Sequence, residues 1–313
     1  MHEWHRRVQT IVEGIDRCIE NRDDDALTLS AIACASGYSE FHMTRKFKEL
    51  TGVCLRDYLR GRRLAFALID VRDTCRTMLE IAVDYGFSSH EAFCRAFKAA
   101  YGVTPGAYRA KPMPVVLRTR LYTFDRYFFG LGEIGMVKST EEVKVYFVSI
   151  PAHKFLHIKN YESEDYFSFW ERQDAVPGCG CDEICGLLDS VKGKLDGDDK
   201  VTGKFDGQIM ARIFEGDRIA LAYGARLPAD YRGEVPARML MMDVAEGEYV
   251  VFEHGAFDYE QERDTVSDKV QAAMDEFDYD AAGYQKDGAK GRVGYLYFNP
   301  ERYLKRVVPV KHK

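Results

Sequence analysis

The sequence predicts a multi-domain chain, in which an all-α domain with a double helix-turn-helix precedes an α+β domain with an antiparallel sheet. A length of 313 residues is typical of two domains, each with its own core. A motif with helical periodicity occurs twice within the first 110 residues. From residue 142 onward, the apolar pattern changes to short β-type runs that are separated by turns and interrupted by two helical stretches.

The first domain, residues 1–110, opens with apolar residues at helical spacing over 3–20. A short helix at 29–35 follows, and the next helix starts near Ser39, a good N-cap, and ends at Gly52. A long helix then spans Leu55 to about Val71, which is about 25 Å at 1.5 Å per residue.

The arrangement of short helix, glycine turn and longer helix then occurs a second time, over 78–85 and 89–101. The first copy contains Ile-Ala at 32–33, Gly-Tyr-Ser at 37–39 and Arg-Lys-Phe-Lys at 45–48, and the second contains Ile-Ala at 81–82, Gly-Phe-Ser at 86–88 and Arg-Ala-Phe-Lys at 95–98. Two helices joined by a tight turn with Gly are the outline of a helix-turn-helix. The sequence therefore predicts two such units, each ending in a helix that can read DNA.

One face of each second helix is apolar and must pack on the preceding helix, whereas the opposite face is polar in both copies. The polar faces carry Phe41, Thr44, Arg45 and Lys48 in the first copy and Glu91, Cys94, Arg95 and Lys98 in the second. Arg can bond guanine as a bidentate pair, Glu can accept from cytosine, and Lys suits phosphate. A single charged face is often only a solvated surface, but the duplication of the same polar positions favours DNA reading.

The net charge of −6 is unusual for a DNA-binding protein, but the charge is unevenly spread. Residues 1–110 carry 16 Lys or Arg against 15 Asp or Glu, so the acid excess belongs to the rest of the chain. In the first domain, the placement of positive charge must matter more than its total.

The polar N-terminus has no signal-peptide pattern, and no run approaches the 18 or so apolar residues of a membrane span. We therefore expect a cytoplasmic protein with no membrane partner. Cys179, Cys181 and Cys185 lie close together but lack the usual spacing of a zinc site. Structural thiols and a metal or redox role both stay open for this cluster, and no cofactor is expected.

Residues 5–110 resemble the DNA-binding domain of the AraC/XylS transcription regulators. The residues that carry the resemblance are Ile32-Ala33, Gly37-Tyr38-Ser39, Arg45-x-Phe47-Lys48, Gly52, Tyr58, Arg62-Arg63-Leu64, Ile81-Ala82, Gly86-Phe87-Ser88, Phe93, Arg95-x-Phe97-Lys98, Gly102, Thr104-Pro105 and Tyr108-Arg109. The resemblance implies a reader of two adjacent major grooves that recruits RNA polymerase. It also implies base contacts from Phe41, Thr44 and Arg45 in the first helix and from His90, Glu91, Cys94 and Arg95 in the second.

Residues 111–141 are predicted to be a linker, because Pro112 and Pro114 cannot continue a helix. The second domain, residues 142–313, then shows a strand–strand–helix–strand–strand order that occurs approximately twice. The expected strands are 143–150, 153–158, 208–214, 218–224, 239–244, 249–254, 293–298 and 306–310, and the expected helices are 162–175 and 262–276.

This half resembles the GyrI-like effector-binding domains through Glu246–Phe252, His254–Phe257, Tyr295-x-Tyr297-Phe298 and Val307–Val310. The resemblance implies an aromatic groove for amphipathic, often cationic small molecules. Many members place a Glu two residues before the tyrosine that matches Tyr297, and here that residue is Tyr295; cation-π contacts could replace the carboxylate. The candidate effector residues are Phe167, Trp170, Tyr249, Phe252, His254, Tyr295 and Tyr297. For each of these side chains taken alone, core packing is the favoured explanation.

Two function classes follow. The first is a ligand-responsive transcription regulator, an activator in the reading we favour, whose second domain binds a small effector. In the second, the α+β domain acts as a small-molecule hydrolase or a sequestering binder, with Glu246, Glu248, Glu253 and His254 as acid–base groups. The sequence shows no activated nucleophile and no set of metal-ligating residues, so we do not expect an enzyme. Turnover of a bound ligand would distinguish the two classes.

Overall fold

The computed structural model describes residues 3–124, 142–197 and 207–313, which form two compact units. The first, called the helical unit below, contains the described residues 3–124 together with Asp182–Lys192. The second, the sheet unit, contains 142–181, 193–197 and 207–313 of the described chain. The chain thus leaves the sheet unit at residue 182 and returns at residue 193, so one helix of the C-terminal half is part of the helical unit.

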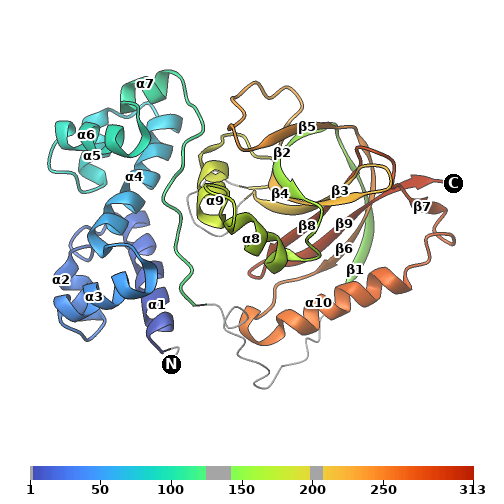
Figure 1. Cartoon of the computed structure of the whole chain (residues 1–313), viewed down its shortest axis with the longest axis horizontal. Helices are drawn as coiled ribbons and strands as arrows, with labels where there is room; N and C mark the ends of the chain where they lie inside the picture. Colours follow the sequence, from blue (N-terminus) through green and yellow to red (C-terminus); the bar gives the residue numbers. More distant parts are fainter. Residues whose placement is uncertain (1–2, 125–141, 198–206) are drawn as a thin grey trace. The chain divides into compact units, whose positions relative to one another are not determined.

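The helical unit is built from two long helices, of 18 and 19 residues, and several shorter ones (Figure 1). Its helices are α1 (Glu3–Glu20), α2 (Leu29–Ala35), α3 (Glu40–Thr51), α4 (Leu55–Asp73), α5 (Met78–Asp84), α6 (His90–Tyr101), α7 (Pro105–Ala110) and, from the C-terminal half, α9 (Cys181–Ser190), whose first residue is counted with the sheet unit. The predicted helices are confirmed, and α4 extends two residues past the expected end. None of the described helices is long and apolar enough to cross a membrane.

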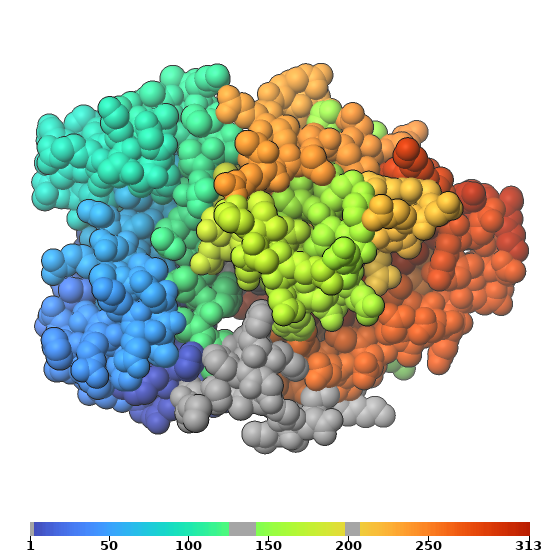
Figure 2. Space-filling model, in the orientation of Figure 1, coloured from blue at the N-terminus to red at the C-terminus, as the bar shows by residue number. Residues whose placement is uncertain are grey.

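Two lobes stand at either end of α4 in this unit: α2 and α3 form the N-lobe, and α5, α6 and α7 form the C-lobe (Figure 1). Figure 2 shows the N-lobe in blue and the C-lobe in teal. One continuous hydrophobic core joins them, with Phe47 and Phe97 wholly buried at corresponding positions of the lobes. The 19 residues of α4 span about 28 Å, so its length sets the spacing between the lobes.

The predicted linker begins as part of the helical unit, and its residues 125–141 lie outside the described residues. Residues 112–124 run in extended form along α1 and α4, where the Leu121 N–H donates to the Tyr58 hydroxyl at 3.3 Å. The Thr123 N–H donates to the Gln9 side chain at 2.8 Å.

The sheet unit contains one antiparallel sheet and two helices of its own. In chain order, its elements are β1 (Lys144–Ile150), β2 (His153–Asn160), α8 (Tyr166–Asp174), β3 (Ile209–Phe214), β4 (Ile219–Pro228), β5 (Leu240–Val244), β6 (Gly247–His254), α10 (Tyr259–Glu276), β7 (Tyr284–Lys286), β8 (Val293–Asn299) and β9 (Tyr303–His312). The predicted fold class is confirmed, because two strands, a helix and two strands occur twice, with the short strand β7 added in the second copy. The strand β7 and the helix α9 were not predicted.

The strands lie in the order β1-β6-β9-β8-β3-β4-β2-β5, and β7 pairs with β9. Side chains alternate between the two faces of such a sheet. One face carries a cluster that includes Phe155, Tyr249 and Tyr295. The other carries Val250 and Phe252, on which α10 packs. This alternation decides which of the candidate effector residues can meet.

Candidate nucleic-acid interface and effector site

The two reading helices, α3 and α6, are fixed at both ends by the same devices. The hydroxyls of Ser39 and Ser89 accept from backbone N–H groups in the first turn, at 3.3 and 3.1 Å. Gly52 and Gly102 end the helices in the left-handed conformation, with φ of 72° and 77°. Each lobe therefore presents a short, rigidly bounded helix.

The turn before each reading helix also needs glycine. Gly86 has a φ of 69°, and a Cβ there would lie 2.7 Å from both the Arg63 guanidinium and the Asp24 carboxylate. Gly37 has a φ of 73° at the corresponding place in the N-lobe. A left-handed backbone at these two positions is why both turns carry Gly.

The exposed face of α3 corresponds to that of α6 at an offset of 50 residues. Met43 and Phe47 are buried, as are Phe93 and Phe97 in the second copy. The predicted reading residues lie on the opposite side of each helix: Phe41, Arg45, Lys48, His90, Glu91, Arg95 and Lys98 are exposed, and Thr44 and Cys94 are half-buried. Phe41 is 75% exposed, which suits an apolar contact with a thymine methyl group.

The basic side chains of this face are available for a partner. Within the described ranges, Arg45, Lys48, Arg95 and Lys98 form no ion pair, whereas the neighbouring Lys46 pairs with Glu49 at 3.0 Å. Unpaired guanidinium and ammonium groups at matching positions in two lobes suit phosphate and guanine contacts.

Four of the predicted residues have local partners, namely Thr44, His90, Glu91 and Cys94. The Thr44 hydroxyl donates to the Glu40 carbonyl at 2.7 Å, so its remaining capacity is as an acceptor. The Cys94 thiol lies 3.4 Å from Nε2 of His90. The Glu91 backbone amide and the Ser89 hydroxyl lower the pKa of the Glu91 carboxyl, which stays an anionic acceptor as cytosine recognition needs.

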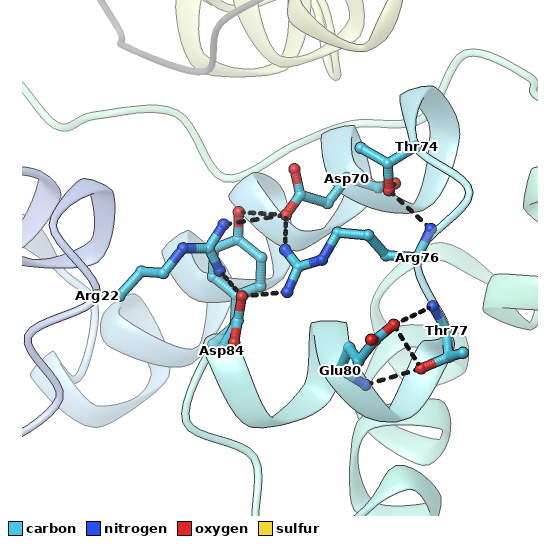
Figure 3. A network of polar contacts seen from close by, with 8 residues as sticks. Arg22, Asp70, Thr74, Arg76, Thr77, Glu80 and Asp84 are labelled. Atoms are coloured by element: carbon cyan, nitrogen blue, oxygen red, sulfur yellow. Dashed lines mark hydrogen bonds and ion pairs between the residues drawn. The ribbon is translucent and has the colours of Figure 1, made fainter.

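A charged network holds the C-lobe against α1 and α4 (Figure 3). Arg76 donates to Asp70 of α4 at 3.1 Å and also pairs with Asp84 of α5. Arg22, which follows α1, pairs with the same two carboxylates, at 3.3 Å from Asp70. The Tyr85 hydroxyl donates to Asp70 at 3.1 Å. The network fixes α5, and with it the adjoining α6.

A second, fully buried ion pair joins α1 to α4. Arg62 donates to the Asp16 carboxylate from Nε at 2.8 Å and from Nη2 at 2.7 Å, and both side chains are 0% exposed. Arg120 donates to Asp16 at 2.7 Å, and Arg62 donates to the Arg118 carbonyl at 2.6 Å. This clamp holds the extended segment on the helix that separates the lobes.

The predicted effector residues do not all lie on one side of the sheet. Tyr249, Tyr295 and Tyr297 share one face, called the tyrosine face below, and the ring centroids of Tyr249 and Tyr295 are 6.4 Å apart. Phe252 is in the cluster under α10, and His254 lies edge-on to Phe257 of that cluster. A single pocket cannot be lined by both sets.

The two predicted effector residues of α8, Phe167 and Trp170, belong to neither strand set. Trp170 packs against Tyr223 with ring centroids 4.9 Å apart, and its buried indole N–H has no hydrogen-bond partner in the described chain. Phe167 lies under the Arg263 guanidinium at 4.8 Å. The assignment of effector residues stays a prediction, and the tyrosine face is where three of them meet.

Two polar residues of the tyrosine face were not predicted. Arg226 of β4 lies over the rings of Tyr295 and Tyr297, at 5.4 and 6.0 Å from their centroids. Asp196, from the segment before β3, pairs with Arg226 and accepts from the Tyr297 hydroxyl at 3.2 Å. The spacing of residues along the sequence does not predict this ion pair, because Asp196 reaches the sheet from an irregular segment.

The carboxylates and the imidazole that we considered for acid–base chemistry do not meet at one site. Glu253 accepts from the Tyr146 hydroxyl at 2.6 Å and pairs with Lys305 at 3.0 Å. The imidazole of His254 lies on the opposite face of β6 and is 0% exposed. Glu248 lies 3.1 Å from His312 at the other end of the strand. In the described ranges, no three His, Cys, Asp or Glu side chains gather as a metal site.

Comparison with known proteins agrees with the geometry of the helical unit. Residues 29–111 match a family described as a helix-turn-helix domain. The TetD protein of transposon Tn10 from Escherichia coli is 41% identical over 100 residues, which cover 32% of this chain and 72% of TetD. The regulatory protein SoxS of Salmonella typhimurium is 37% identical over 102 residues, which cover 33% of this chain and 92% of SoxS.

The transcriptional regulator Rob of Salmonella typhimurium is 41% identical over 91 residues, which cover 29% of this chain and 32% of Rob. The match thus spans most of the short relatives and about a third of Rob. Two helix-turn-helix lobes with matching exposed faces, and relatives that share their sequence, place this chain in the AraC/XylS family of DNA-binding transcription regulators.

Proposed function

We propose that α3 and α6 read two successive major grooves and that the sheet unit binds a small amphipathic effector, in the manner of the GyrI-like domains. The single observation that supports the DNA role is the equivalence of the two exposed faces, with basic groups at 45 and 48 and again at 95 and 98. We propose further that the protein acts in the cytoplasm as an activator that recruits RNA polymerase.

If an effector bound to the sheet unit is to alter DNA binding, the two units must be connected. The helix α9 connects them through the chain itself. This helix belongs to the helical unit, while the residues on both sides of it belong to the sheet unit. Its C-terminus is held at α4, where Arg72 donates to the Ser190 carbonyl at 2.8 Å and Lys192 pairs with Asp73 at 2.7 Å. We propose that ligand binding in the sheet unit acts on the helical unit through α9.

We expect alanine substitutions of Arg95 and Lys98 in α6 to affect DNA binding differently, because we assign Arg95 to a base and Lys98 to a phosphate. Arg95→Ala should weaken binding to the preferred DNA by about 1–3 kcal/mol and relax the preference at one base position, because a bidentate pair with guanine is lost. Lys98→Ala should weaken binding to every sequence alike and reduce the dependence of affinity on salt. Binding isotherms on a panel of single-base variants, each at several salt concentrations, measure both effects.

Arg45→Ala and Lys48→Ala in α3 are the matched pair in the N-lobe. Their effects should fall on the other half of the DNA site, since the two lobes are equivalent and lie at opposite ends of α4.

A uniform loss of affinity across all sequences for Arg95→Ala would show that this guanidinium contacts phosphate and reads no base.

A further inference from the structure

The tyrosine face contains a ready-made site for a carboxylate. Arg226 donates to Asp196 from Nε at 2.7 Å, and its Nη2 also contacts the same carboxylate, so the pair is bidentate. The Tyr297 hydroxyl adds a third donor to this carboxylate, at 3.2 Å. Three donors from two strands therefore converge on one planar acidic group.

The donors and the acceptor come from different kinds of structure. Arg226 and Tyr297 are on β4 and β8, in the middle of the sheet, where strand pairing fixes their backbones. Asp196 is on the irregular segment 193–197, which is tied to β4 by a bond from the Leu195 N–H to the Arg226 carbonyl at 2.9 Å. Because Asp196 is not on a strand, a rotation of its side chain away from the guanidinium would need no change in strand pairing.

The face has more donors than its own acidic group uses. The Tyr249 hydroxyl is buried and has no hydrogen-bond partner in the described chain. Burial lowers the pKa of the His153 imidazole, which favours its neutral form. Its Nδ1 faces the Pro151 carbonyl at 2.8 Å, so its Nε2 is the acceptor for the Tyr295 hydroxyl at 2.6 Å. Burial also raises the pKa of the Tyr297 phenol, so this group donates at neutral pH. The positive charge of the site therefore comes from Arg226.

The rings of the tyrosine face already contact a cationic side chain of the protein itself. Arg226 lies over Tyr295 and Tyr297, which are the rings that a cationic effector would need. A ligand cation must displace the guanidinium of Arg226, whose side chain is only 14% exposed, whereas a ligand anion need displace only the Asp196 carboxylate.

We propose that the tyrosine face binds a small aromatic or amphipathic carboxylate, with Asp196 as the internal occupant that the ligand replaces. This proposal rests on the effector role proposed for the sheet unit. In the complex, Arg226 and Tyr297 hold the ligand carboxylate, and the aromatic part of the ligand lies against the tyrosine rings.

Benzoate and benzyltrimethylammonium are suitable probes, because both carry one aromatic ring and they differ in charge. Calorimetric titration of the full chain at constant ionic strength measures their binding. Asp196→Ala should bind benzoate at least about tenfold more tightly than the wild type, since the internal competitor is gone. Adding Arg226→Met should abolish that binding. If Asp196→Ala does not fold, Asp196→Asn keeps the side-chain volume and removes the charge, and it should show the same direction of change.

Asp287→Ala is the matched control. Asp287 also pairs with an arginine of the sheet unit, at 2.6 Å from Nε of Arg292, but that guanidinium donates in addition to the carbonyls of Ala245 and Glu246. This variant should not gain affinity for benzoate. Equal benzoate affinity in the wild type and Asp196→Ala, or tighter binding of benzyltrimethylammonium than of benzoate, would overturn the proposal.

The titration uses no DNA, so it separates the ligand class from the regulatory role. Benzoate binding without any change in DNA occupancy supports the carboxylate site and counts against effector control. Failure of benzoate to bind Asp196→Ala defeats the carboxylate site, whatever the DNA measurements show.

Discussion

Arg62→Ala is expected to lower the free energy of unfolding of the helical unit by about 3–5 kcal/mol. The substitution leaves the Asp16 carboxylate fully buried with Arg120 as its remaining cation, and it removes the donor to the Arg118 carbonyl. A buried charge that loses its partner keeps its desolvation cost, which is the reason for the large effect. Because the clamp lies between α1 and α4, the loss should also loosen the segment 112–124.

Urea unfolding followed by the fluorescence of Trp4 measures this effect. Trp4 lies in α1 and packs on Tyr38 with ring centroids 4.6 Å apart, so it reports on the helical unit. A Trp170→Phe background removes the other tryptophan of the chain. Arg60→Ala is the control, since its guanidinium is 63% exposed and lies 3.6 Å from an exposed Asp57. That substitution should cost at most about 1 kcal/mol, and a similar cost for both would contradict the buried clamp.

Gly186→Ala is expected to destabilise the docking of α9 by about 3 kcal/mol. A Cβ at this position would lie 2.4 Å from the Leu117 carbonyl oxygen and 3.1 Å from the Leu117 nitrogen. These are backbone atoms, so they cannot rotate away as a flexible side chain would. The helix must move off the segment, which also breaks the bond from the Val115 N–H to the Ser190 hydroxyl at 3.0 Å.

Hydrogen exchange of the α9 amides measures this detachment directly, and urea unfolding gives the free energy. Gly14→Ala is the matched control, because Gly14 is inside α1 and a Cβ there meets nothing within 4 Å. That variant should be more stable than the wild type by about 0.5–1 kcal/mol, since Ala favours helix over Gly. Unchanged exchange in Gly186→Ala would mean that α9 does not need its close contact with residue 117.

The helical unit could be predicted almost completely because its signals are local. Serine caps, the left-handed glycines at 37, 52, 86 and 102, and the helical spacing of apolar residues each act within a few positions. The reading faces followed from the same spacing, since burial of Phe47 and Phe97 determines which side of each helix stays exposed.

The helix α9 was missed because its signal is weak over only 10 residues. Ile184, Cys185 and Leu188 are buried at helical spacing, but the pattern is interrupted by Gly186 and follows a run of glycine and cysteine. Its role depends on contacts with residues about 70 positions earlier, which no local pattern records.

The effector residues show a different limit. Strand alternation alone separates Tyr249 from Phe252 and His254, so their division between two faces could have been predicted from the period of two. The pairing of Arg226 with Asp196 could not, because it depends on where an irregular segment returns to the sheet. The resemblance to the GyrI-like domains predicted the tyrosines as effector residues. Only the three-dimensional structure shows that the charged Arg226 lies over two of their rings.

A hydroxyl-radical footprint on DNA selected from a random pool tests most directly whether the two equivalent lobes read DNA from one face. We expect an asymmetric site of about 20 base pairs with two protected patches one helical turn apart. Arg45→Ala should remove protection from one patch and Arg95→Ala from the other. A single protected patch, or protection of every sequence alike, would contradict the claim that α3 and α6 both recognise bases.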